Sequence, residues 1–160
     1  MKAITLTQPW ATLVAIGAKK IETRSWRTDY RGPLAIHAAK GKYNDEYLLQ
    51  KIEPFYSALH AAGIVSRLQM PLGGVVAVCE LVGVIPTAHF RESSPVYRRT
   101  GPDGRYYRYE LTKDEMQFGD YTPGRYAWLL ADVQALAVPV PAKGALGLWE
   151  WSAPELAHEA

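Results

Sequence analysis

The sequence contains a single cysteine among 160 residues, and this scarcity excludes several classes of site. Cys79 cannot form a disulfide within the chain, which fits a reducing compartment. It lies inside the apolar run VVAVCELVGV, where a buried structural thiol is expected rather than a nucleophile. Because the four histidines share no ligand spacing either, the sequence predicts no zinc site and no other metal site.

Several common motifs are also missing. Neither of the glycine-rich phosphate loops GxGxxG and GxxxxGK[ST] occurs, and no serine lies in a GxSxG elbow. These absences argue against a hydrolase of the usual serine, cysteine or zinc kinds, and we expect no cofactor. No apolar run approaches the roughly 20 residues of a membrane-spanning helix, and no basic leader precedes an apolar stretch. We therefore expect a cytoplasmic protein with no membrane partner.

Length and composition predict one globular domain. The chain is 48% hydrophobic and 21% charged, which is ordinary for a globular protein, and we find no repeat, low-complexity tract or linker. We expect a single domain over residues 1–152, followed by a loosely held tail at 153–160. The oligomeric state is left open.

The positive charge is concentrated in two segments, although the net charge is only +2. The segment from Lys19 to Lys42 carries a net +5 and the segment from Arg91 to Arg108 a net +3, while the rest of the chain is acidic. Such a distribution suits a phosphate-bearing partner. Two solvated basic faces would give the same pattern.

Hydrophobic patterning predicts an α+β fold with about six strands. A short helix after Pro9 is expected to end at Gly17, and a longer one, over Tyr43–Ala62, to be interrupted at Pro54. One further short helix is expected over Leu111–Phe118. The predicted strands are Lys2–Leu6, Lys20–Trp26, Leu34–Ala39, Val75–Ile85, Tyr126–Ala137 with a bend at Asp132, and Leu146–Trp151. Because strands and helices do not alternate regularly, a small, mostly antiparallel β-barrel with one long and two to three short helices packed on it is favoured.

The polar segment Thr87–Tyr109 interrupts this pattern. It is rich in arginine and tyrosine and contains the turn signal GPDG at 101–104. We expect a long basic excursion, or a hairpin, that is more mobile than the rest and covers a functional cleft.

The densest group of reactive side chains lies between Gln8 and His37. Side chains alternate along a strand, so one face should carry Lys20, Glu22, Arg24 and Trp26. Lys19 could act as a general base if burial lowers its pKa, although a neighbouring carboxylate would raise it. Arg24 could bind a phosphate or carboxylate, or Glu22 and Arg24 could form an ion pair that braces the strand.

These residues resemble a known family. The run GAKKIETRSW matches the GxKxxExR pattern of the ASCH domain family, whose fold is similar to the PUA barrel. QPWATL, YRGPLAIHAAK, GGVVAVCELVGV and YAWLLADVQAL resemble further parts of ASCH proteins, so the resemblance covers roughly residues 3–151. It implies a β-barrel with a cleft beside the GxKxxExR strand that binds RNA, DNA or a nucleoside.

The resemblance also implies functional residues. The motif positions are Gly17, Lys19, Glu22 and Arg24. Two tryptophans, Trp10 and Trp26, are implied to stack on a base. The phosphate contacts implied are Arg31, Lys40 and Lys42, and His37 is a further ligand contact.

Members of one branch resemble an amidohydrolase of acetylated cytidine, and another branch is associated with RNA cleavage. Either activity would use Lys19 and Glu22. The second amidohydrolase position is Thr in that branch but Glu22 here, and the third is unassigned, with Glu80 and Glu92 as candidates. A coactivator-like protein-interaction module is a further alternative.

Overall fold

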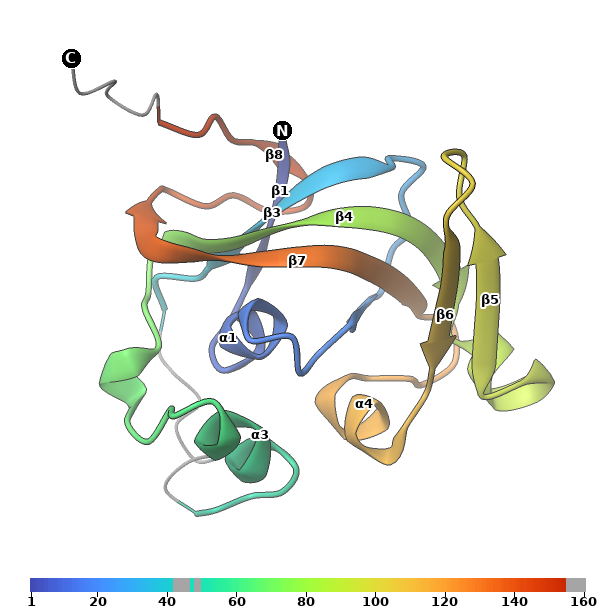
Figure 1. The fold of residues 1–160 in the computed structure, drawn as a ribbon, viewed down its shortest axis with the longest axis horizontal. Helices are drawn as coiled ribbons and strands as arrows, with labels where there is room; N and C mark the ends of the chain where they lie inside the picture. Colours follow the sequence, from blue (N-terminus) through green and yellow to red (C-terminus); the bar gives the residue numbers. More distant parts are fainter. Residues whose placement is uncertain (42–46, 48–49, 155–160) are drawn as a thin grey trace.

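The computed structural model describes residues 1–41, 47 and 50–154, and a six-stranded sheet forms its centre. The strand order is β2-β7-β4-β3-β1-β8, and only the β1–β3 pair is parallel (Figure 1). The strands are β1 (Lys2–Leu6), β2 (Ile21–Arg24), β3 (Gly32–Ala38), β4 (Gly74–Pro86), β7 (Tyr126–Pro141) and β8 (Trp149–Glu150). The predicted α+β class with a mostly antiparallel sheet is confirmed.

The sheet is not closed into a barrel, so that part of the prediction is wrong. Within the described residues, β2 and β8 are the two edges of the sheet and do not pair with each other. The last strand has only two residues, Trp149–Glu150, where we predicted six. The preceding segment contains Gly147 with φ at +67°, a left-handed conformation that interrupts a strand. Such a short edge strand cannot close the sheet.

The two longest strands, β4 and β7, curve around the core. Their register shifts at three places, and each shift bends and twists the strands locally. Asp132 adopts φ of +53°, which confirms the bend predicted there. The concave side is filled by buried side chains from the sheet and from α1, including Trp128, Leu34, Ile36 and Val14. This core fixes α1 against the sheet.

The described helices are all short. α1 (Trp10–Ala15) ends as predicted, with Gly17 at φ +79°, and α4 (Lys113–Phe118) begins at Thr112, whose hydroxyl accepts from the Glu115 amide. α3 (Phe55–Ala61) starts directly after Pro54; much of the N-terminal half of the long helix expected over 43–62 lies outside the described residues. A 3₁₀ turn, η1 (Arg67–Gln69), and a π turn, η2 (His89–Ser93), complete the helices. No helix in the described part of the chain is long and apolar enough to cross a membrane.

The polar excursion contains a hairpin of β5 (Val96–Thr100) and β6 (Tyr106–Glu110), with the predicted turn between them. The hairpin stands beside the sheet, to the right in Figure 1. The Tyr109 hydroxyl donates to the Leu130 carbonyl at 2.8 Å, and Arg105 makes two hydrogen bonds to the Asp132 carboxylate. These contacts anchor the hairpin to β7.

Candidate functional site

A polar cleft lies where the C-terminal ends of β1 and β2 meet α1 and the segment after α4. Its volume is about 540 Å³. The lining side chains come from four parts of the chain and are Thr5, Leu6, Thr7, Trp10, Glu22, Thr23, Arg24, Ser25, Trp26, Tyr47, Gln117, Phe118, Gly119, Asp120 and Arg125. The cleft therefore lies beside the GxKxxExR strand, as the resemblance implied.

Lys19 and Glu22 meet at the base of this cleft. Lys19 precedes β2, and its ammonium group lies 3.6 Å from Oε1 of Glu22 and donates to the Ile21 carbonyl. The Lys19 side chain is completely buried and does not line the cleft, whereas Glu22 does. A buried ammonium needs such partners because desolvation of an unpaired charge is costly. Lys19 therefore neutralises the charge of the Glu22 carboxylate and fixes its position from the buried side of the strand.

Two buried polar atoms in the cleft have no partner among the described residues. Oε1 of Glu22 accepts from the Thr23 amide at 2.8 Å, but Oε2 accepts from nothing. Arg24 donates through Nη2 to the Thr5 carbonyl at 2.7 Å, but its Nε is unpaired. Burial lowers the pKa of Arg24, and Glu22 acts in the opposite direction. The wall of the cleft thus contains one anionic acceptor and one cationic donor that no described residue satisfies.

Two half-buried tryptophans flank these polar groups. Trp10 is fixed by its indole N–H, which donates to the Phe118 carbonyl at 2.8 Å, and its ring meets Tyr47 edge-on at 5.4 Å. Trp26 packs edge-on against the fully buried Trp128, with ring centroids 4.8 Å apart. Both rings pack against the core on one side and line the cleft on the other, so they are held rigidly at the edge of the cleft.

The opposite wall is built from the turn that precedes β7. The Asp120 amide donates to the Thr23 hydroxyl at 2.9 Å, and Arg125 donates to the carbonyls of Asp120 and Thr23. A Cβ on Gly119 would come within 3.1 Å of the Thr23 side chain and 2.9 Å of the Tyr121 ring. Glycine therefore lets this wall approach β2 closely.

A second buried carboxylate lies on α4, at the start of β2. Oε1 of Glu115 accepts from the Lys20 amide at 2.6 Å, while Oε2 has no partner among the described residues. Burial raises the pKa of Glu115, against the opposing effects of the Lys20 amide and the Lys19 ammonium group. Burial also raises the pKa of Tyr121, with further contributions from Glu115 and Glu22.

The raised pKa of Glu115 predicts a pH effect on stability. Between its ordinary pKa of 4.5 and the raised value, the folded state binds more protons than the unfolded state. The contribution of Glu115 to stability therefore falls as pH rises through this window. Glu115→Gln keeps the acceptor for the Lys20 amide and carries no charge. At pH 7 we expect its free energy of unfolding to be higher than that of the wild type by up to roughly 1 kcal/mol, and near pH 4 we expect the two to be equal.

Urea unfolding at several pH values measures this effect, with the exposed Glu92→Gln as the control. An advantage of Glu115→Gln that grows toward acid pH would contradict the assignment.

The structure brings together only some of the residues implied by the resemblance. Trp10, Glu22, Arg24 and Trp26 line the cleft, whereas Lys19 lies behind Glu22 and Gly17 follows the end of α1. Arg31 is exposed near the hairpin, and its pKa is lowered by burial and then by Arg99. His37 and Lys40 line a different cavity, described below, and Lys42 lies outside the described residues.

We predicted that the segment Thr87–Tyr109 covers the cleft. This prediction is wrong, because no residue of 87–109 lines the cleft. Lys20 is exposed and does not line it either. Within the described residues, no three His, Cys, Asp or Glu side chains gather closely enough to hold a metal ion.

Sequence reasoning missed the wall made by Gly119, Asp120 and Arg125, and the buried Glu115 behind it. One signal was present. The turn-rich stretch GDYTPGR directly precedes a predicted strand, and an antiparallel partner for the Lys20–Trp26 strand would place that stretch beside Arg24. The observed register, with Arg24 opposite Tyr126, is this arrangement.

A short buried polar strand beside an open cleft on a mixed sheet defines a small α+β domain, and comparisons place it in a family. The ASCH domain model matches residues 4–139. The mouse and human proteins called Activating signal cointegrator 1 are 30% and 29% identical to this chain over 92 residues. That match covers 58% of this chain but 16% of each relative. The chain belongs to the ASCH domain family.

Solved structures agree on the fold. A crystal structure of ASCH from Zymomonas mobilis has a TM-score of 0.52 at 16% identity, over 94% of this chain and 87% of that one. A single-residue variant of the same protein gives 0.51 with the same coverage and identity. At this identity the likeness concerns the fold alone, and it supports a PUA-like arrangement.

Proposed function

We propose that this domain binds RNA or a modified nucleoside by taking a nucleobase into the cleft. The observation that carries the proposal is the unpaired Oε2 of Glu22, an anionic acceptor on a residue that is only 8% exposed. Leaving a buried acceptor unpaired costs about 1–3 kcal/mol, so a ligand that donates to it recovers that free energy.

The neighbouring groups favour a nucleobase over other ligands. Every base presents hydrogen-bond donors and acceptors side by side on its Watson–Crick edge, which suits an acceptor on Glu22 and a donor on Arg24. Trp10 and Trp26 supply apolar faces at the edge of the cleft, and base stacking contributes about 1–3 kcal/mol in single-strand binders. The proposal includes a cytoplasmic location, which the unpaired, buried Cys79 supports.

The basic segments extend this proposal from nucleosides to nucleic acid. Arg98 and Arg108 lie directly opposite each other on the hairpin, where like charges repel, and the Glu110 carboxylate, 3.4 Å from Arg108, offsets part of this charge. A phosphate backbone would offset the rest, so the hairpin adds to the case for RNA or DNA.

Hydrolysis of an N-acylated nucleoside, or cleavage of RNA, is the second candidate, and the same carboxylate favours it. Oε2 of Glu22 could accept a proton from a water molecule placed in the cleft. Lys19 cannot be the base while its ammonium group donates to Ile21 and pairs with Glu22, so its part in either activity is to position Glu22.

The test is to titrate the protein with the four ribonucleosides, acetylcytidine and a short single-stranded RNA. Tryptophan fluorescence measures the binding at each step. Because a charge-assisted hydrogen bond is lost, we expect Glu22→Gln to weaken binding by about 10- to 100-fold. Trp26→Ala, which leaves the buried ion pair intact, should weaken it by about 5- to 150-fold.

Glu92→Gln, at an exposed glutamate that does not line the cleft, is the matched control. Equal binding by the Glu22→Gln and Glu92→Gln proteins, both folded by circular dichroism, would refute the proposal. Chromatography of the acetylcytidine and RNA samples separates binding from turnover, because products above the Glu22→Gln level would indicate hydrolysis.

A further inference from the structure

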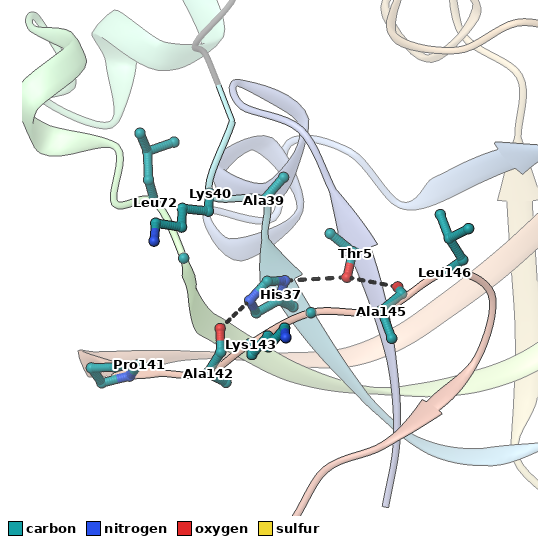
Figure 2. Close-up of a pocket in the computed structure, with 12 residues that line it drawn as sticks. Thr5, His37, Ala39, Lys40, Leu72, Pro141, Ala142, Lys143, Ala145 and Leu146 are labelled. Carbon is teal, nitrogen blue, oxygen red and sulfur yellow. Dashed lines mark hydrogen bonds between the residues drawn. The ribbon is translucent and has the colours of Figure 1, made fainter.

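A second and larger cavity lies on the other side of β1 from the cleft. Its volume is about 1030 Å³ (Figure 2). The end of β3, the start of β4 and the segment after β7 form its walls, with lining residues Thr5, His37, Ala39, Lys40, Leu72, Gly73 and 141–146. Nothing in the function proposed above uses this cavity.

The lining of this cavity is positively charged. Lys40 and Lys143 contribute ammonium groups from two different segments, and none of the described residues that line the cavity is acidic. Within the described residues neither lysine has a hydrogen bond or an ion pair, whereas Lys2 pairs with Glu150 at 2.6 Å. Both side chains are exposed, so water screens most of their mutual repulsion, and an anion bound near both would be attracted by the two charges together.

The backbone that carries Lys143 is held firmly by His37. The ring of His37 is 1% exposed, with Nε2 2.8 Å from the Ala142 carbonyl oxygen and Nδ1 3.2 Å from the Thr5 hydroxyl oxygen. Trp149 donates to the same hydroxyl group at 3.1 Å. His37 therefore uses both ring nitrogens within the protein and orders the wall, rather than reaching toward a ligand.

Gly144 brings the segment that carries Lys143 close to this wall. A Cβ on Gly144 would lie 2.7 Å from the His37 ring and 2.8 Å from the Thr5 hydroxyl, so only glycine lets the segment pack there. Gly73 lies against the aliphatic stem of Lys40, where a Cβ would be 3.7 Å away. The cavity is thus a built feature with fixed walls, and Figure 2 shows both lysines among its lining side chains.

One residue connects this cavity to the cleft. Thr5 lines both, because its carbonyl accepts from Arg24 on the cleft side while its hydroxyl contacts His37 on the other. The cleft and the second cavity therefore lie on either side of one residue near the end of β1.

We infer that the second cavity binds a phosphate group through Lys40 and Lys143, and that this phosphate belongs to the nucleotide or RNA whose base occupies the cleft. The inference rests on the proposed function for the identity of the ligand, but its charge argument stands alone. The cavity is larger than one phosphate requires, and the apolar side chains of Leu72, Pro141 and Leu146 give a sugar or a neighbouring base a surface to contact.

The test compares Lys40→Gln, Lys143→Gln and the double variant with Lys113→Gln, an exposed lysine that lines neither cavity. The probes are a short fluorescein-labelled single-stranded RNA, cytidine, cytidine 5′-monophosphate and inorganic phosphate. We expect about fivefold weaker RNA binding for each lysine removed, and a salt slope smaller by about 0.7 for each. Cytidine affinity should not change.

Inorganic phosphate should also shift the amide NMR signals of Gly144 and Ala145 in the wild type but not in the double variant. The inference would be overturned if the double variant had the same RNA affinity and salt slope as Lys113→Gln and phosphate shifted no amide signal. This holds even if Glu22 proves essential for binding in the cleft. Lysine-dependent phosphate shifts without any binding of cytidine or RNA would instead refute the proposed function and support the anion site. A lysine-dependent gain for cytidine 5′-monophosphate, but not for RNA, would identify a free nucleotide as the source.

Discussion

Lys19→Met is expected to lower the free energy of unfolding by about 3–5 kcal/mol, because it leaves the buried Glu22 carboxylate without its counter-ion. The Lys19 side chain is 0% exposed, so water cannot replace it. Methionine has a similar length and fills the same space, which removes packing as the main cause of the loss. The ammonium group also donates to the Ile21 carbonyl, whose acceptor would be left unpaired.

Urea unfolding followed by tryptophan fluorescence measures this effect, and the exposed neighbour Lys20→Met is the matched control, expected to change stability by less than about 0.5 kcal/mol. The double variant Lys19→Met with Glu22→Gln removes both charges. It should be more stable than Lys19→Met alone, since no unpaired charge remains buried. Equal losses for Lys19→Met and Lys20→Met would show that the ion pair does not stabilise the fold.

The meeting of Lys19 and Glu22 shows what the sequence could predict about the site. The motif spacing identified both residues, but strand alternation places them on opposite faces unless the chain bends before Glu22. The structure resolves this, because β2 begins only at Ile21 and Lys19 lies in the irregular segment after Gly17. A helix that ends in a left-handed glycine could be predicted, but the direction in which the chain leaves it depends on tertiary packing.

The far wall of the cleft was beyond sequence reasoning for a related reason. Gly119, Asp120 and Arg125 lie about a hundred residues after Glu22, and only the pairing of β2 with β7 brings them together. Periodicity identifies strands but does not identify their partners. His37 shows the same limit, because its position near a strand end was clear while its two hydrogen-bond partners, Thr5 and Ala142, come from distant segments.

The barrel prediction failed at one end of the sheet. Six strands with a mostly antiparallel pattern are compatible with a closed barrel or an open sheet, and closure depends on the length of the edge strands. The apolar run LGLWEW suggested a full strand, yet only Trp149–Glu150 pairs with β1. Of the rest of that segment, Leu146 lines the second cavity, whereas Leu148 and Trp151 pack against the core.

Trp128→Ala is expected to destabilise the protein by about 3–5 kcal/mol and also to weaken ligand binding in the cleft. Trp128 is fully buried in β7, its indole N–H donates to the Trp26 carbonyl at 3.3 Å, and its ring supports that of Trp26 edge-on. Truncation leaves a cavity directly behind a residue that we propose stacks on the base. Both the position and the rigidity of Trp26 should suffer, and stacking contributes about 1–3 kcal/mol.

Trp151→Ala is the matched control, because Trp151 is also buried but belongs to a different cluster of the core, with Ala3, Ala35 and Val75. Both alanine variants should lower the urea midpoint, whereas only Trp128→Ala should reduce the affinity for cytidine, whose base would bind in the cleft. Trp128→Phe keeps an aromatic ring and loses the N–H, so it provides a folded protein in which the effect on affinity can be measured. Wild-type affinity in both Trp128→Phe and a folded Trp128→Ala protein would mean that Trp26 does not depend on this support, and the link between core packing and the cleft would then be wrong.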